Sequence, residues 1–475
     1  MTLDKPIHLQ QRLAAVRRTM SLKVEGKIAG LTGLTVEVKD FIAPVGAQCE
    51  IVTRNGIRIP AQVIGFRGDV SILMPLSEMT GISSGDLVRC VAGEVSIPVG
   101  DSLLGRVLNG SGEPIDGQGP LLCQMKQALQ SRRIAPLSRT RITEPIGTGI
   151  RAIDALLTCG SGQRLGIFSG PGVGKSVLLG MISRYTAADV NVIALVGERG
   201  REVREFIEKD LGPQGLARSV VIVSTSDESA PLRVQAGFAA ATIADTFRRQ
   251  GKNVMMLMDS VTRIAMAQRQ IGLAMGEPPT TKGFTPSVFA LLPRLLESCG
   301  RDDVGSITGF FTVLVEGDDL SEPISDAMRS ILDGHLWLSR QLANRGHYPA
   351  VDILESISRL MVDIVDSEHL QAAREITRLT AVYRDIEDLV NIGAYAPGTN
   401  PEYDLAVNNR KAIQEFLQQG IAERAAYSES VERLKTLAKQ VVRATGGKSR
   451  EPRGETVPSK PQKPTLGLER MAVGL

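Results

Sequence analysis

The segment SGPGVGKS at residues 169–176 constrains the fold of this chain more than any other feature. It follows the apolar run RLGIF and precedes the run SVLLGMISRY, which has helical character. A phosphate-binding loop requires this strand–loop–helix context, because its backbone N–H groups and the start of the helix must face phosphate oxygens. The first position of the usual pattern is Gly and here is Ser169, which is small enough for the loop to form. The segment therefore predicts nucleotide binding, and an ordinary glycine-rich turn is the less favoured alternative.

Within this loop, Lys175 is expected to reach the β- and γ-phosphates, and the Ser176 hydroxyl is expected to ligate Mg²⁺. The glycines let the backbone turn toward the phosphates without steric cost. The predicted nucleotide-binding residues of the loop are Gly170, Pro171, Gly172, Val173, Gly174, Lys175, Ser176 and Val177.

Two carboxylates indicate that the bound nucleotide is also hydrolysed. The run MMLMD places Asp259 at the end of a buried strand, where it can hold the Mg²⁺ shell through water. The run VNVIALV is followed by Gly197 and Glu198, and a carboxylate there could polarise an attacking water. Either acid alone could be a solvated loop residue, but their joint appearance at the ends of strands favours a hydrolytic site.

Strand and helix patterns alternate after residue 164, which predicts an α/β fold with a mostly parallel sheet and helices on both faces. The helical runs REVREFIEKDL and VQAGFAAATIADTFRRQ separate the earlier strands. The predicted strands are QRLGIF, VNVIALV, SVVIVS, NVMMLMD and SITGFFTVLV.

The flanking regions differ from this core. Short β-branched runs separated by glycine turns between residues 23 and 95 predict a small β-barrel, with a hairpin at Asn55-Gly56 whose two residues need positive φ. Residues 367–443 lack strand runs and are rich in helix formers. The proline-rich, basic tail at 447–475 predicts disorder.

Residues 8–20 carry Leu9, Leu13, Val16 and Met20 at helical spacing, which predicts an amphipathic helix. It could pack on its own domain as a frayed terminus, or it could dock a partner. The residues alone favour neither interpretation over the other.

Composition narrows the functional class. The 475 residues carry a net charge of only +3 and 4% aromatic residues, which argues against nucleic-acid binding through bulk charge or base stacking. Neither a membrane-spanning apolar run nor the apolar stretch of a signal peptide occurs. Five scattered cysteines without a CxxC pair fit a reducing cytoplasm and mostly buried thiols.

Several segments, taken together and in order, make the chain resemble the ATPase of the flagellar protein-export (type III secretion) apparatus, a relative of the rotary ATP synthase α and β subunits. The resemblance covers about residues 24–445. It rests on LGRVLNGSGEPIDG (104–117), SGPGVGKS (169–176), GERGREVREFIE (197–208), the stretch 258–297, SILDGHLWLSRQLA (330–343) and YPAVDILESISR (348–359).

The resemblance implies a RecA-like P-loop core with an N-terminal small β-barrel and a C-terminal helical domain. It divides the chain into a docking segment (1–22), the barrel (23–95), the ATP-binding domain (96–380), the helical domain (381–446) and the tail (447–475). The function implied is ATP hydrolysis coupled to flagellar export, in the cytoplasm and peripherally at the inner membrane.

Roles for single residues also follow from the resemblance. Glu198 would orient the hydrolytic water, Asp259 would be the Walker B carboxylate, and Arg199 and Arg263 would support the site. Tyr348 would stack on adenine, and Arg359 would be an arginine finger acting on the neighbouring subunit. Without the resemblance, Tyr348 reads as a core aromatic and Arg359 as a surface or packing residue.

The implied partners are other copies of the chain in a hexamer, a stator-like protein at the N-terminus, the export gate and chaperone–substrate complexes.

The presence of both Glu198 and Arg359 in one chain resembles the pattern of a homo-hexamer in which every interface is catalytic. IGAYAPGTNPEYDLAV (392–407) is similar to export ATPases and replaces the acidic loop of the rotary catalytic subunit. TVLVEGDD (312–319) and FLQQGI (416–421) favour the flagellar branch over the virulence branch. A rotary catalytic subunit, a Rho-like RNA translocase and a non-catalytic nucleotide-binding scaffold remain as alternatives.

Overall fold

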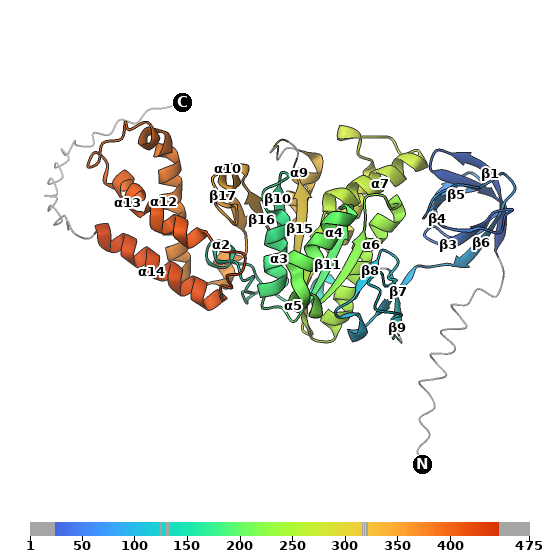
Figure 1. The fold of residues 1–475 in the computed structure, drawn as a ribbon, viewed down its shortest axis with the longest axis horizontal. Helices are drawn as coiled ribbons and strands as arrows, with labels where there is room; N and C mark the ends of the chain where they lie inside the picture. The colour runs from blue at the N-terminus through green and yellow to red at the C-terminus, as the bar shows by residue number, and fades with distance from the viewer. Residues whose placement is uncertain are drawn as a thin grey trace, which may run out of the picture.

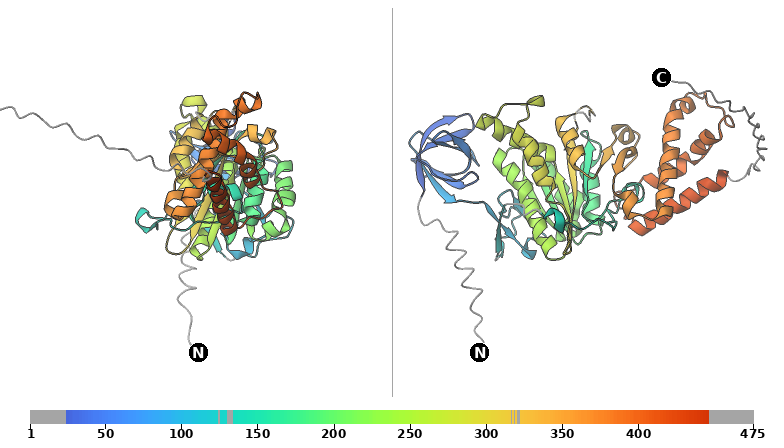
Figure 2. Two further views of the ribbon diagram at one scale, coloured as in Figure 1. Left: turned by 90° about the vertical axis from the view of Figure 1, so that its left-hand side faces the viewer. Right: turned by 180° about the vertical axis from the view of Figure 1, so that it is seen from behind.

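The computed structural model describes residues 24–123, 125–129, 134–315, 317, 319 and 322–445. These residues form three parts in a row: a β-barrel at one end, a sheet covered by helices in the middle, and a group of helices at the other end (Figure 1). The view from behind shows the same order (Figure 2). The predicted docking segment at 1–22 and the predicted disordered tail at 447–475 lie outside the described residues.

The N-terminal part is a closed six-stranded barrel with the strand order β1-β2-β5-β4-β3-β6. Side chains alternate between its interior and the surface, as the period of two in a strand requires. Its core includes Val36, Ile51 and Val88, none of which is exposed. The strands are β1 Glu25–Thr32, β2 Thr35–Lys39, β3 Gln48–Val52, β4 Arg58–Arg67, β5 Val70–Pro75 and β6 Leu87–Ala92.

The predicted hairpin is present, but its turn differs from the expected one. Strands β3 and β4 pair with Val52 opposite Arg58, so five residues connect them instead of two. Gly56 has a φ of 80°, whereas the described non-glycine residues with positive φ are Asp40 and Lys282 and do not include Asn55. The wider loop is closed by a hydrogen bond from the Thr53 N–H to the Ile57 carbonyl, so Asn55 needs no left-handed conformation.

The central part contains a nine-stranded sheet with the order β17-β16-β10-β15-β13-β11-β12-β8, to which β14 is added beside β15. All five predicted strands are found in it, and they pair in parallel. The strands are β8 Val107–Asn109, β10 Arg164–Ser169, β11 Val190–Val196, β12 Ser219–Ser224, β13 Asn253–Asp259, β14 Gly300–Arg301, β15 Ser306–Leu314, β16 Gly334–Leu338 and β17 Val351–Ser358. A separate pair joins β7 Ser96–Val99 to β9 Met125–Ala128.

Helices cover both faces of this sheet (Figure 1). The predicted helix at 201–211 is α4 followed by a π-helical turn, and the one at 234–250 belongs to α6 as far as Arg249. The helices are α2 Arg151–Leu156, α3 Lys175–Tyr185, α4 Gly200–Glu205, α5 Gly212–Ala217, α6 Ala230–Arg249, α7 Val261–Met275, α8 Pro286–Leu296, α9 Pro323–Ile331, α10 Arg340–Asn344 and α11 Met361–Ile364. The short turns are η1 Asp101–Leu103, η2 Pro136–Ser138, η3 Phe206–Leu211 and η4 Thr281–Gly283.

The C-terminal part consists of α12 Ser367–Asn391, α13 Pro401–Leu417 and α14 Tyr427–Thr445. The sequence-based division between residues 380 and 381 falls inside α12. This helix starts at its N-cap Asp366, whose side chain accepts the His369 N–H, and it continues without interruption to Asn391. No helix among the described residues is both long and apolar enough to span a bilayer.

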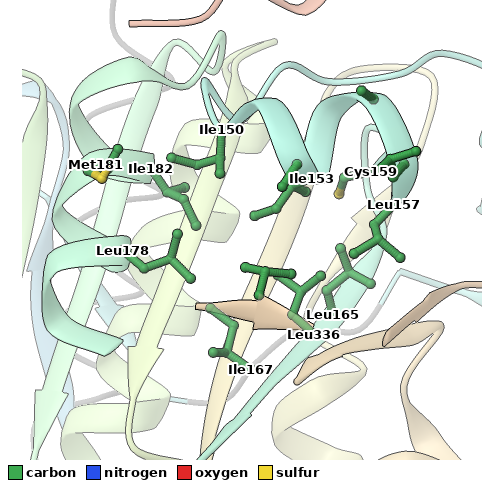
Figure 3. Close-up of a cluster of buried hydrophobic side chains, with 14 of the residues drawn as sticks. Ile150, Ile153, Leu157, Cys159, Leu165, Ile167, Leu178, Met181, Ile182 and Leu336 are labelled. Carbon is green, nitrogen blue, oxygen red and sulfur yellow. The ribbon is translucent and has the colours of Figure 1, made fainter. Parts of the chain in front are cut away.

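A hydrophobic cluster fixes the phosphate loop between its strand and its helix (Figure 3). Leu165 and Ile167 of β10 and Ile182 of α3 are fully buried in it. Burying each of these side chains contributes about 1.5–3 kcal/mol. The elements on either side of residues 170–174 are therefore held rigidly, and the loop itself is left to face the ligand.

Candidate active site

The phosphate loop has the backbone conformation that its glycines predict. Gly172 and Gly174 have φ values of 78° and 87°, a region that side chains other than glycine rarely adopt. Gly174 is the N-cap of α3, so the first N–H groups of that helix face the loop. A Cβ at Gly172 would meet no atom within 4 Å, whereas Val173 is 2% exposed and anchors the loop. The loop therefore forms an open cradle lined by backbone N–H groups.

The carboxyl ends of neighbouring strands bring the predicted charged residues together. The Lys175 Nζ lies 2.5 Å from Asp259 Oδ1 and 3.7 Å from Glu198 Oε1. Asp259 Oδ1 also accepts a hydrogen bond of 2.7 Å from the Thr312 hydroxyl. Asp259 ends β13, and Glu198 follows β11, which pairs with it. Parallel strands thus assemble, at one edge of the sheet, side chains far apart in the sequence.

Burial changes the acid–base properties of this cluster. Burial disfavours the Lys175 charge, but Asp259 and Glu198 outweigh it, so the pKa of Lys175 lies above its usual value. Burial, with repulsion from Asp259, raises the pKa of Glu198 to about 7, although Lys175 opposes this rise. Glu198 is therefore suited to accept a proton near neutral pH.

Glu202 is a member of this site that the sequence analysis missed. A hydrogen bond with Glu198 lowers the pKa of Glu202 and contributes to raising that of Glu198. Glu202 lies in the first turn of α4, four residues after Glu198. That spacing in GERGREVREFIE was the available signal, because residues four apart at the start of a helix can meet.

Tyr348 lies against the phosphate loop. A Cβ at Gly174 would lie 3.4 Å from Tyr348 Cε1, so the tyrosine ring is next to this glycine. Tyr348 is 44% exposed, so its ring remains accessible to solvent. This exposure excludes the interpretation as a core aromatic. The Gln419 N–H, from the segment between α13 and α14, donates to the Tyr348 carbonyl at 2.9 Å, so the C-terminal part borders the site.

The two supporting arginines differ in position. Arg263 packs on the backbone beside Glu198, because a Cβ at Gly197 would come within 2.7 Å of Arg263 Cβ. Arg199 points outward, with a side chain that is 83% exposed and an ion pair of 3.8 Å to Glu202. Within one subunit, the structure therefore places Arg263 beside the charged cluster and Arg199 at its surface.

Arg359 lies at the opposite end of the sheet from its own phosphate loop. Its N–H donates to the Asp333 carbonyl, and the Asp333 N–H donates to the carbonyl of Arg164, the first residue of β10. The loop follows Ser169 at the far end of β10, and five residues of strand span roughly 16 Å. The Arg359 side chain donates to the Arg329 carbonyl at 3.3 Å. It therefore does not take part in the charged cluster of its own subunit.

The donors at the site fit a magnesium ion. Mg²⁺ prefers oxygen ligands and usually binds one or two carboxylates together with substrate phosphates and waters. Ser176 lies in the first turn of α3 and is exposed, and Asp259 faces the Lys175 ammonium. These two residues would hold the ion.

Family models match the three parts of the chain. The nucleotide-binding domain of the ATP synthase alpha/beta family matches residues 149–358, and its β-barrel domain matches residues 28–91. The T3SS EscN ATPase C-terminal domain matches residues 365–436.

The flagellum-specific ATP synthase of Bacillus subtilis (strain 168) is 50% identical over 90% of this chain and 98% of its own length. The type 3 secretion system ATPase of Xanthomonas euvesicatoria is 48% identical over 86% of this chain and 93% of its own.

The chain belongs to the family of flagellum-specific and type III secretion ATPases.

A solved structure supports the assignment. The assembled ATPase EscN of the enteropathogenic E. coli type III secretion system matches this export ATPase with a TM-score of 0.82 and 46% identity, over 87% of this chain and all of that one. A second structure contains EscN in complex with its central stalk EscO, with a TM-score of 0.80 and 45% identity, over 87% of this chain and 100% of that one. The predicted resemblance, fold class and ATPase activity are confirmed by these matches.

Proposed function

We propose that this export ATPase works as a ring of six identical subunits that hydrolyses ATP to drive flagellar protein export in the cytoplasm, peripherally at the inner membrane. The observation that carries the proposal is that the two ends of β17 lie at opposite ends of the sheet. Tyr348 precedes it beside the subunit's own phosphate loop, and Arg359 follows it at the opposite end of the sheet. A subunit arranged in this way supplies a complete binding site and one residue that can serve only a neighbour.

The chemistry at each site follows from the geometry. Lys175 and the N–H groups of residues 172–176 hold the phosphates of ATP, and Tyr348 stacks on the adenine. Glu198 holds the attacking water and accepts its proton, while Asp259 and Ser176 keep the metal side of the site in place. Mg²⁺, when bound, neutralises charge on the β- and γ-phosphates. Arg263 supports the backbone that carries Glu198, and Arg199 faces the subunit boundary.

Arg359 of one subunit meets the negative charge that develops on the γ-phosphate held by the next subunit. An arginine supplied in this way typically accelerates phosphoryl transfer by about 10³–10⁵-fold. ATP hydrolysis should therefore rise more steeply than linearly with protein concentration as rings assemble. Arg359→Ala should bind nucleotide and assemble normally, and yet remain slow at every concentration.

Mixing two inactive variants tests the proposal. Arg359→Ala retains an intact phosphate loop, and Lys175→Ala retains an intact Arg359, so a mixed ring contains interfaces that join the two. Phosphate release should rise on mixing above the assembly concentration. Unchanged phosphate release, in samples whose subunit exchange is confirmed by native mass spectrometry, would assign Arg359 to packing instead of catalysis.

The proposed partners follow the same family. A stator-like protein would bind residues 1–22 and tie the ring to the export gate, and chaperone–substrate complexes would deliver the cargo. EscN forms a complex with its central stalk EscO, and this chain would bind a corresponding stalk protein. Nucleic acid is not an expected partner. A pull-down of the stator-like protein by a variant lacking residues 1–22 should fail, and undiminished capture would remove the docking role.

The virulence branch is the second candidate, because the Xanthomonas euvesicatoria relative is nearly as similar as the flagellar ones. Deletion of the gene should abolish flagellar filaments under the flagellar hypothesis, and it should leave motility intact under the other.

A further inference from the structure

Two cysteines face each other inside the N-terminal barrel. Cys49 of β3 and Cys90 of β6 are directly paired in the antiparallel register of these strands. The Cys90 N–H donates to the Val24 carbonyl at 2.9 Å, on the other side of β6. Because the N–H and C=O of one strand residue point the same way, Cys90 turns its polar backbone groups away from β3. Cys49 and Cys90 therefore form a non-hydrogen-bonded pair, in which opposite side chains lie closest.

This arrangement meets the geometric requirement of a disulfide. In a non-hydrogen-bonded pair the two Cα atoms lie about 4.5 Å apart. Disulfides join residues whose Cα atoms are about 4.4–6.8 Å apart, so the bond can form without moving the strands far. The two thiols are close enough that Cys90 contributes, after burial, to raising the pKa of Cys49. Register shifts by one residue beside the pair, between Gln48 and Cys49, which leaves the backbone room to adjust.

The two thiols differ in access. Cys49 is 2% exposed in the barrel core, and burial raises its pKa to about 12. Cys90 is only partly buried, although burial also raises its pKa. A small oxidant therefore reaches Cys90 first, and Cys49 is placed to attack it from the inside.

The remaining cysteines lack this arrangement. Cys159 and Cys299 are buried in the central part, and Cys123 lies 2.8 Å from the Ser102 hydroxyl. In the strand pairings of the described residues, no other cysteine stands opposite a cysteine.

We infer that Cys49 and Cys90 are a redox-active pair that closes a reversible cross-strand disulfide in the barrel when a small-molecule disulfide such as oxidised glutathione accumulates. In the first step the Cys90 thiolate attacks one sulfur of the small disulfide, breaks its S–S bond and releases one thiolate. In the second step Cys49 gives up its proton, bonds to the Cys90 sulfur and displaces the second thiolate. The pair loses two protons and two electrons, and the small disulfide becomes two thiols.

The bond would tie β3 to β6 and close a loop of about 40 residues, which restricts the unfolded barrel and stabilises the folded one. Strand β6 also holds β1, where the described chain begins, so the bond lies close to the exit of the N-terminal segment. The ATP site lies in the central part, so oxidation should leave basal turnover unchanged.

The experiment treats the full-length protein with oxidised glutathione and counts thiols after denaturation. Two of the five thiols should disappear, a peptide pair linking Cys49 to Cys90 should appear by mass spectrometry, and dithiothreitol should reverse both changes. The melting temperature of the oxidised protein should rise by a few degrees. All five thiols remaining titratable, or a glutathione adduct on Cys90 in place of the linked peptides, would overturn the inference.

Two variants separate the pair from general thiol reactivity. Cys49→Ala should stop the reaction at the first step, so a glutathione adduct should accumulate on Cys90 without a rise in melting temperature. Cys123→Ser is the matched control, because it removes a partly buried thiol that has no cysteine opposite it. That variant should still form the Cys49–Cys90 bond, and loss of the bond in it would contradict the assignment.

Discussion

Ion pairs of similar length differ in their surroundings between the central part of this molecule and the N-terminal barrel. Lys175 and Asp259 lie 2.5 Å apart with side chains that are 13% and 5% exposed. Arg89 and Glu25 of the barrel lie 2.8 Å apart, but their side chains are 46% and 36% exposed. The first pair sits in a cluster that raises the pKa of Glu198 to about 7, whereas the second is screened by water. Burial, more than distance, distinguishes a reactive site from a surface contact.

The largest expected effect comes from removing the buried cation. Lys175→Ala should abolish ATP hydrolysis and weaken nucleotide binding, because the charge that meets the β- and γ-phosphates is lost. It also leaves Glu198 and Asp259 without their shared counter-ion. Phosphate release and binding of a fluorescent ATP analogue measure the two effects. Near-normal turnover would contradict the assignment of the phosphate loop.

The next effect separates binding from chemistry. Glu198→Gln keeps the size of the side chain but cannot accept a proton, so turnover should fall by about 10²-fold or more while ATP still binds. Glu208→Gln is the matched control, since Glu208 is exposed and pairs with Arg204 along α4 and the turn that follows it. Normal hydrolysis by Glu198→Gln would place the water-activating group elsewhere.

The buried carboxylate should also cost stability, and the cost has a defined pH range. A pKa of about 7 in the folded state against the usual 4.5 means that the folded protein binds more protons between these values. The free energy of unfolding should therefore fall as pH rises from about 4.5 to 7. Glu198→Gln lacks this dependence, so its melting temperature should exceed that of the wild type by a few degrees at pH 8 and match it near pH 4. A constant difference across this range would contradict the raised pKa.

The same proton equilibrium should appear in turnover. Wild-type hydrolysis should decline as pH falls below about 7, because Glu198 becomes protonated and can no longer accept a proton from water. A rate that stays flat between pH 8 and pH 6, at saturating ATP, would show that this carboxylate is not the group that limits the reaction.

Much of the charged site could be predicted because its residues follow strands. An apolar run that ends in a carboxylate fixes both the strand and the sheet edge, as for Asp259, and glycines before Lys175 specify the loop. Contacts and pKa values that depend on distant segments of the chain could not be predicted from composition or periodicity. Tyr348 meets Gly174 only because β17 folds back beside β16, and the raised pKa of Glu198 depends on burial and on Asp259.

Prediction of the strands and turns was limited in the same way. The parallel strands were predicted by their apolar runs, since a strand buried on both faces tolerates few polar residues. The hairpin at Asn55-Gly56 was predicted as a two-residue turn, but β3 ends at Val52 and the loop is longer. The opposition of Cys49 and Cys90 was likewise invisible, because it depends on the register of strands that are not neighbours in the sequence.

The smallest expected effect tests the other side of the comparison. Arg89→Ala and Glu25→Ala, combined in a double-mutant cycle, should give a coupling free energy of only about 0.2–1 kcal/mol, because water screens both side chains. The coupling should shrink further at high salt, and ATP turnover should not change. Chemical denaturation of the four proteins at two salt concentrations measures it. A coupling of several kcal/mol, or a loss of turnover, would mean that the barrel carries a buried electrostatic network like that of the central part. Burial would then no longer explain why, of these two described parts, the central part contains the reactive charges and the barrel does not.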